Sequence, residues 1–114
     1  MKNTKTVRLG SALILVYSDN LTHEYCEPLK EYLQTLVTMQ DYEHMVIDIS
    51  GLGTIDNCGL HLLVSLTSRV RGHGKMFHLM SPPRHFLELL QDKQLLRFFN
   101  IFRNEDDMFS SLPI

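Results

Sequence analysis

The apolar residues of this chain change their period at a short polar loop near its middle. Residues 44–49 form a largely apolar, β-branched run, which is typical of a strand covered on both faces. The pattern predicts that this buried strand is followed by a loop over residues 54–59 and a helix that begins at Asn57 or Cys58. The positions expected on the buried face of that helix fall at helical spacing, at Leu60, Leu63, Val64, Thr67 and Val70.

Similar changes of period divide the rest of the chain. Because proline is tolerated in a helix only within the first turn, Pro28 places the regular start of the first helix near Tyr25. The resulting order, β-β-α-β-α-β-α-β-α, predicts an α/β fold with a mixed, mostly parallel β-sheet and about four helices. The other expected strands are residues 6–9, 11–17, 75–80 and 101–103. The expected helices are residues 22 or 25 to 38, 57 or 58 to about 71, a segment after Pro82-Pro83, and a final helix that Asn104 caps and that runs through Ser110.

Composition and charge narrow the possible classes of protein. The 114 residues are close to the usual size of one domain, so we expect a single domain over residues 1–114. Hydrophobic residues make up 44% and charged residues 21%, which indicates a packed core and not a disordered chain. The formal net charge of −2 argues against nucleic-acid binding. Residues 12–17 are too short an apolar run to cross a bilayer and lack the layout of a signal peptide, so we expect a cytoplasmic protein without membrane insertion.

We expect function at the start of the helix that follows the central strand. A helix start presents unpaired backbone N–H groups and the positive end of the helix dipole. Asp56 and Asn57 are residue types that cap such an end, and Asp56 could equally be a hydrogen-bonding group at a partner interface. At a helix start the pKa of a thiol such as Cys58 can fall, which suits a redox sensor or a nucleophile. The competing interpretation of Cys58 is a small residue that fills a serine-sized site.

The remaining motifs argue against catalysis and against a metal site. A phosphatase or sulfurtransferase loop needs an arginine six positions after its cysteine, and Val64 stands there. The six histidines fall on different predicted elements, and none is paired with a cysteine or carboxylate at the ligand spacing of a helix. Cys26 and Cys58 lie in contexts of different periodicity, so a disulfide framework is not expected. We therefore predict a protein that is not an enzyme and has no cofactor or metal.

Four segments, together with the order of elements, match the pattern of a known family. Residues 46–52 read Val-Ile-Asp-Ile-Ser-Gly-Leu and residues 54–60 read Thr-Ile-Asp-Asn-Cys-Gly-Leu. They resemble the STAS family, named for sulfate transporters and anti-sigma-factor antagonists, in which an apolar strand with Asp is followed by a loop reading Asp-Ser-Ser/Thr-Gly-Leu. Residues 71–75 precede a predicted strand as in the family, and residues 95–99 stand in the place of its Gly-Leu-aromatic segment. The resemblance covers most of the chain and implies the STAS fold.

In the bacterial antagonists to which this resemblance points, the residue after the loop aspartate is a serine that a partner kinase phosphorylates. That kinase is also the anti-sigma factor, and the unphosphorylated antagonist binds it and frees the sigma factor. A phosphate would add nearly two negative charges at the interface, which is enough to abolish docking. In this chain Asn57 occupies the acceptor position, and an asparagine cannot accept a phosphoryl group.

The resemblance therefore implies a protein-binding regulator that docks a kinase-type anti-sigma factor through the loop and the exposed face of the following helix. Two alternatives stay open. The domain could be a structural subunit of a larger assembly, such as a lipid-transporter accessory subunit or a signalling scaffold, or it could carry out thiol chemistry at Cys58. The sequence names neither the partner nor the oligomeric state. The residues of the candidate surface are Thr54, Asp56, Asn57, Cys58, Gly59 and His61.

Overall fold

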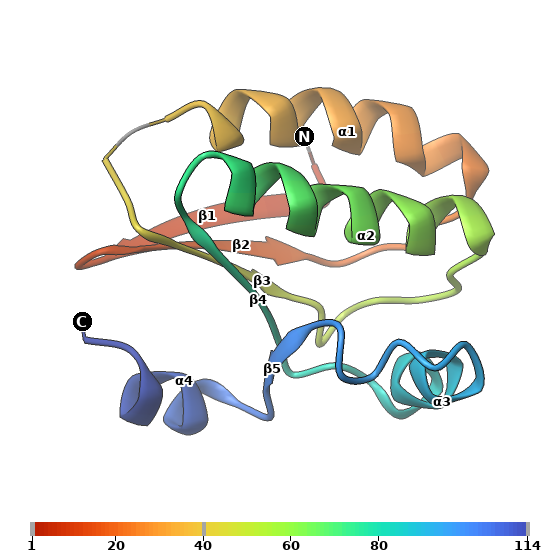
Figure 1. Ribbon diagram of the computed structural model, residues 1–114. Helices are drawn as coiled ribbons and strands as arrows, with labels where there is room; N and C mark the ends of the chain where they lie inside the picture. The colour runs from red at the N-terminus through yellow and green to blue at the C-terminus, as the bar shows by residue number, and fades with distance from the viewer. Residues whose placement is uncertain (1, 40, 114) are drawn as a thin grey trace.

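The computed structural model describes residues 2–39 and 41–113, which form five strands and four helices in the predicted order (Figure 1). Within this described part of the chain, no helix has the length and the apolar character needed to cross a membrane. The elements are β1 (Thr4–Leu9), β2 (Ala12–Tyr17), α1 (His23–Val37), β3 (His44–Asp48), α2 (Asn57–Gly72), β4 (Met76–Met80), α3 (Arg84–Asp92), β5 (Asn100–Phe102) and α4 (Glu105–Ser111).

The described strands form one sheet in the order β1-β2-β3-β4-β5. β1 pairs antiparallel with β2 across a tight hairpin, in which Gly10 has a φ of 56° that favours glycine, and each later pair is parallel. Parallel neighbours need crossover connections, which α1, α2 and α3 supply between successive strands. The predicted α/β fold with a mixed, mostly parallel sheet is confirmed, and β3 lies at its centre.

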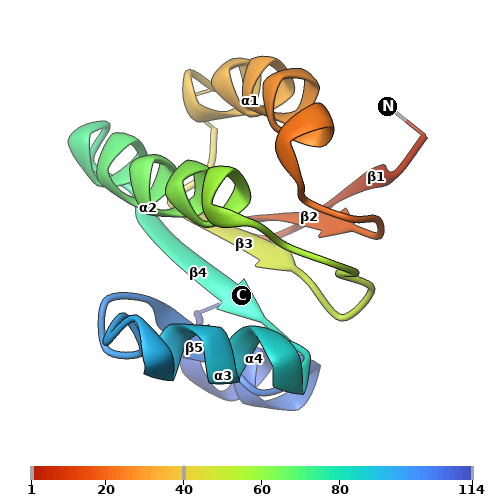
Figure 2. The ribbon, with the colours of Figure 1, turned by 90° about the vertical axis from the view of Figure 1, so that its right-hand side faces the viewer.

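The two faces of this sheet are covered unequally. Successive side chains of a strand point to opposite faces, so Val46 and Ile47 pack into two different apolar clusters. We call the side covered by α1 and α2 the thick face and the side covered by α4 the thin face (Figures 1 and 2). Phe86 of α3 joins the thick-face cluster, whereas Met108 of α4 closes the smaller cluster of the thin face.

The central strand is buried as predicted. Val46, Ile47 and Ile49 are each at most 2% exposed. Leu63 of α2 is buried in the same thick-face cluster as Ile47 and Ile49, while Val64 packs against that cluster and stays half-buried. This strand ends at the loop that the sequence indicated as the functional region.

The sequence offered Thr22 or Tyr25 as the start of the first helix, and the later start near Tyr25, argued from Pro28, is wrong. α1 begins at His23, so that Pro28 lies beyond the first turn, inside the helix. Pro28 is exposed, so water can bond the carbonyl group that the missing proline N–H leaves unpaired. The start of the helix is set from outside it, because the carboxylate of Asp56 accepts the backbone N–H of His23 at 2.9 Å.

Candidate functional site

Two loops lie side by side at the ends of β2 and β3, and together they position the candidate site. Leu21 and Ile55 form an isolated parallel bridge, in which the Leu21 N–H donates to the Thr54 carbonyl at 2.7 Å. A second backbone bond, of 3.0 Å, runs from the Gly53 N–H to the Asp19 carbonyl. Because backbone groups make these bonds, the loop that contains residues 54–59 is fixed to its neighbour independently of its exposed side chains.

Asp56 connects the starts of two helices. One of its oxygens accepts the Gly59 N–H at 3.0 Å, and this bond makes Asp56 the N-cap of α2, which was one of the two interpretations that the sequence left open. The other oxygen accepts the His23 N–H of α1, where the N-cap residue Thr22 forms no side-chain cap. The Gly59 N–H, followed by that of His23, holds the pKa of the Asp56 carboxyl below its ordinary value. Asp56 is therefore a carboxylate, and its charge faces the positive ends of both helices.

Gly59 is buried beneath the loop, and the close contact there requires a glycine. A Cβ atom at this position would lie 2.1 Å from the carbonyl oxygen of Leu21 and 3.0 Å from the Ile55 side chain. The loop and the start of α2 can approach the neighbouring loop only because this side chain is absent. Of the six residues predicted for the candidate surface, Gly59 is thus placed to position the others.

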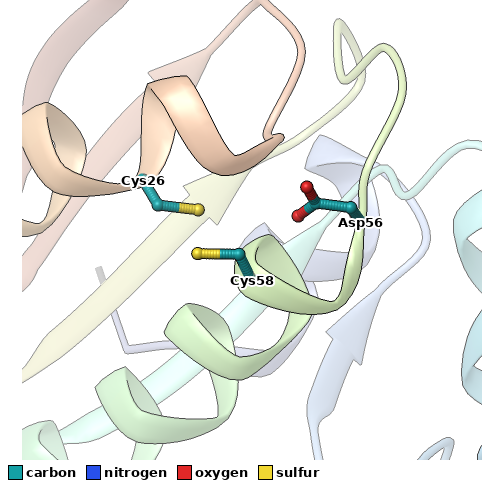
Figure 3. Close-up of side chains that lie close together, drawn as sticks. All are labelled: Cys26, Asp56 and Cys58. Atoms are coloured by element: carbon teal, nitrogen blue, oxygen red, sulfur yellow. The ribbon is translucent and has the colours of Figure 1, made fainter.

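The remaining predicted residues lie together around the start of α2. Asn57 is the first residue of the helix and is exposed, as are Thr54 and His61. Cys58 is half-buried, and its side chain points toward Cys26 of α1 (Figure 3). Thr54, Asn57 and His61 therefore present two neutral polar side chains and a histidine to solvent near the start of α2.

Cys26 is the residue that the sequence did not connect with this site. Its thiol points toward that of Cys58 across the two helices, with Asp56 beside them (Figure 3). Both cysteines are free, and burial, followed by the neighbouring Cys58 thiol, raises the pKa of Cys26 to about 12. The available sequence signal was weak: each cysteine falls close to the start of its own helix, on the side that packs inward.

Two hollows flank the loop. A groove of about 300 Å³ runs between α1 and α2 and is lined by residues that include Cys26, Cys58 and His61. On the other side a hollow of about 460 Å³ lies between the loop and α3. There the His85 ring nitrogen Nε2 lies 2.6 Å from the Gly53 carbonyl oxygen, a contact that sequence reasoning missed.

Comparisons with known proteins identify the family of this chain. A family model for the STAS domain matches residues 3–108. The chain belongs to the STAS domain family. This membership confirms the resemblance drawn from the loop and from the order of elements. A comparison with curated protein sequences found no match.

Solved structures with the same fold include both regulators and a transporter domain. A crystal structure of a candidate anti-sigma factor antagonist from Thermotoga maritima has a TM-score of 0.87 and 18% identity, covering 97% of this chain and 95% of that chain. The unphosphorylated anti-sigma factor antagonist SpoIIAA has a TM-score of 0.69 and 11% identity, and the match covers 94% of each chain. The phosphorylated form of SpoIIAA, from Bacillus, has a TM-score of 0.71 and 12% identity, and the match covers 96% of this chain and 99% of that one. The murine anion transporter Slc26a9 has a TM-score of 0.78 and 15% identity, and the match covers 91% of this STAS chain and 18% of the transporter.

Proposed function

We propose that this STAS protein is a non-catalytic, cytoplasmic regulator that docks a kinase-type anti-sigma factor, in the manner of an anti-sigma-factor antagonist. The docking surface consists of residues 54–59 and the exposed face of α2. The observation that carries the proposal is the exposure of Asn57 at the first position of α2, beside the exposed Thr54 and His61. Family membership and the likeness to SpoIIAA support the proposal.

Asn57 sets the binding state of this surface. Its side chain is neutral and close in size to serine, so the loop resembles an antagonist that carries no phosphate. Because an asparagine cannot accept a phosphoryl group, a kinase partner would not release this protein by phosphorylating residue 57. The protein would therefore act as a permanently binding-competent antagonist.

The loop is also prepared for binding before a partner arrives. The bonds from Leu21 to Thr54 and from Gly53 to Asp19 hold its backbone, and Asp56 holds the first turns of both helices. A surface that is already ordered loses less conformational entropy when it docks. The rigid loop therefore favours recognition with little change of shape.

Replacement of Asn57 with aspartate tests the proposal. Asn57→Asp adds one negative charge with almost no change in shape, and an unpaired charge at a desolvated interface typically costs a few kcal/mol. We expect binding of a kinase-type anti-sigma factor, measured by calorimetry, to weaken at least about tenfold. The melting temperature should not fall, because the helix dipole stabilises a carboxylate at this position.

The control is a charge on the other side of the molecule. Ser110 of α4 is exposed, and Ser110→Asp should leave the affinity unchanged. Equal affinity of the wild type and Asn57→Asp would show that residues 54–59 are not the docking surface.

The second candidate function is a structural STAS subunit of a larger assembly, such as a lipid-transporter accessory subunit or a signalling scaffold. The likeness to the Slc26a9 transporter favours it, and so does Asn57, because such a subunit needs no phosphorylation. Gene neighbourhood separates the two functions. A histidine-kinase-like ATPase, a phosphatase or a sigma factor nearby supports the antagonist, whereas a transporter permease and ATPase support the subunit.

A further inference from the structure

Three donor groups converge where the first turns of α1 and α2 meet (Figure 3). The Sγ atoms of Cys26 and Cys58 and a carboxylate oxygen of Asp56 all lie within 4.8 Å of one another. In the part of the chain that the structure describes, this is the one group of three such donors found so close together. We propose that these three residues bind a Zn²⁺ ion.

The spacing of the donors suits a tetrahedral ion after a small adjustment. Zinc bonds of about 2.3 Å to sulfur and about 2.0–2.2 Å to oxygen place the ligand atoms of a tetrahedron roughly 3.5–4 Å apart. The donors lie within 4.8 Å of one another, so zinc binding would draw them together by up to about 1 Å. Cys26 and Cys58 supply these donors from two different helices, so the ion would join α1 to α2.

The chemistry of the donors selects the class of metal. Thiolates are soft ligands that favour zinc over magnesium or calcium, which prefer oxygen ligands. As two Zn–S bonds form, the thiols of Cys26 and Cys58 release two protons to solvent, and no electrons are transferred. The dication then offsets most of the three negative charges of the two thiolates and the Asp56 carboxylate.

The surroundings meet two further requirements of a zinc site. Backbone N–H groups of Gly59 and His23 hold the Asp56 carboxylate at 3.0 and 2.9 Å, and such outer contacts orient a metal ligand. Cys26 and Cys58 also line the groove of about 300 Å³ between the helices, which gives an ion a path from solvent. Three protein ligands leave the fourth position to a water molecule from this groove.

The experiment uses the full-length, reduced and metal-free protein. Zn²⁺ uptake is measured by competition with a chromophoric chelator, and Co²⁺ is added as a spectroscopic substitute. We expect one ion per chain and a near-ultraviolet thiolate-to-cobalt charge-transfer band. Cys58→Ser should remove most of this band and weaken zinc binding at least about tenfold.

Asp56→Asn provides a second, independent variant. Asparagine is as good an N-cap as aspartate, so the variant should fold, which circular dichroism checks. It should keep the charge-transfer band of the two cysteines and bind zinc about tenfold more weakly. Cys26→Ser should behave like Cys58→Ser.

The matched control removes a metal-binding side chain on the thin face. The ring nitrogens of His44 and His78 lie 3.2 Å apart, so His44→Ala tests the competing pair of nitrogen donors. It should leave the zinc affinity unchanged. Absence of uptake by the wild type, or equal affinity in a Cys26→Ser, Cys58→Ser double variant, would overturn the proposal. Recovery of a Cys26–Cys58 disulfide from zinc-loaded protein would overturn it as well, because disulfide sulfurs are not thiolate ligands.

Discussion

The two faces of the sheet give the same strands different surroundings. On the thick face, side chains such as Ile47 and Phe77 lie in an apolar cluster closed by three helices. On the thin face, His78 is buried between the ring of His44 and the ring of Phe102, next to the smaller cluster under α4. The candidate site lies at the end of the thick face, where its two main helices begin. The comparison shows that the rigid loop of the candidate site lies at the closely packed thick face, whereas the thin face contains the buried imidazole ring of His78.

The largest expected difference between the faces follows from two isoleucines. Ile47 of β3 is 2% exposed on the thick face, and Ile14 of β2 is 6% exposed on the thin face. Ile47→Ala should lower the free energy of unfolding by roughly 2–5 kcal/mol, because it leaves a cavity under α1 and α2. Ile14→Ala should cost less, because Ile14 already borders a groove of about 120 Å³ into which its surroundings can relax. Urea denaturation of the two variants measures both losses, and equal losses would contradict the comparison.

A smaller effect is expected where the thick face meets the loop. Gly59→Ala should destabilise the protein by roughly 3 kcal/mol, because the new Cβ collides with the Leu21 carbonyl oxygen. Gly72 is the matched control: it lies in the same helix, and a Cβ there has no heavy atom within 4 Å. Gly72→Ala should be neutral or stabilising by up to about 1 kcal/mol. Thermal unfolding that ranks the two variants in the opposite order would show that the loop is not tightly packed.

The smallest expected effect is a pH dependence of stability that arises from His78 on the thin face. Burial, followed by the nearby His44, lowers the pKa of His78 from 6.5 to about 4. The unfolded chain therefore binds a proton more readily than the folded protein, and stability falls as the pH falls from about 6.5 to about 4. The contribution of His78 to that fall should be on the order of 2 kcal/mol. His78→Phe should flatten the dependence in this window, as measured by chemical denaturation at several pH values; an identical slope in both proteins would count against a neutral, buried His78.

The order of elements and the cap at Asp56 could be predicted because both depend on local patterns. The change of period after residue 49 marks a strand and then a helix, and an aspartate just before a helix indicates an N-cap. The second bond of Asp56, to His23, depends on how two distant loops lie together, and no local pattern contains it. The same reason explains why the start of α1 was misplaced and why Cys26 was not connected with Cys58.

The shared carboxylate also has a consequence for local opening. Asp56 accepts hydrogen bonds from backbone N–H groups in the first turn of α1 and in the first turn of α2. Neither turn can therefore unravel without disturbing the hydrogen bonding of the other. Native-state hydrogen exchange should therefore find the His23 and Gly59 amides opening in a single event with one free energy. The two helix starts would then form one cooperative unit, although most of the first helix and the central strand separate them along the chain.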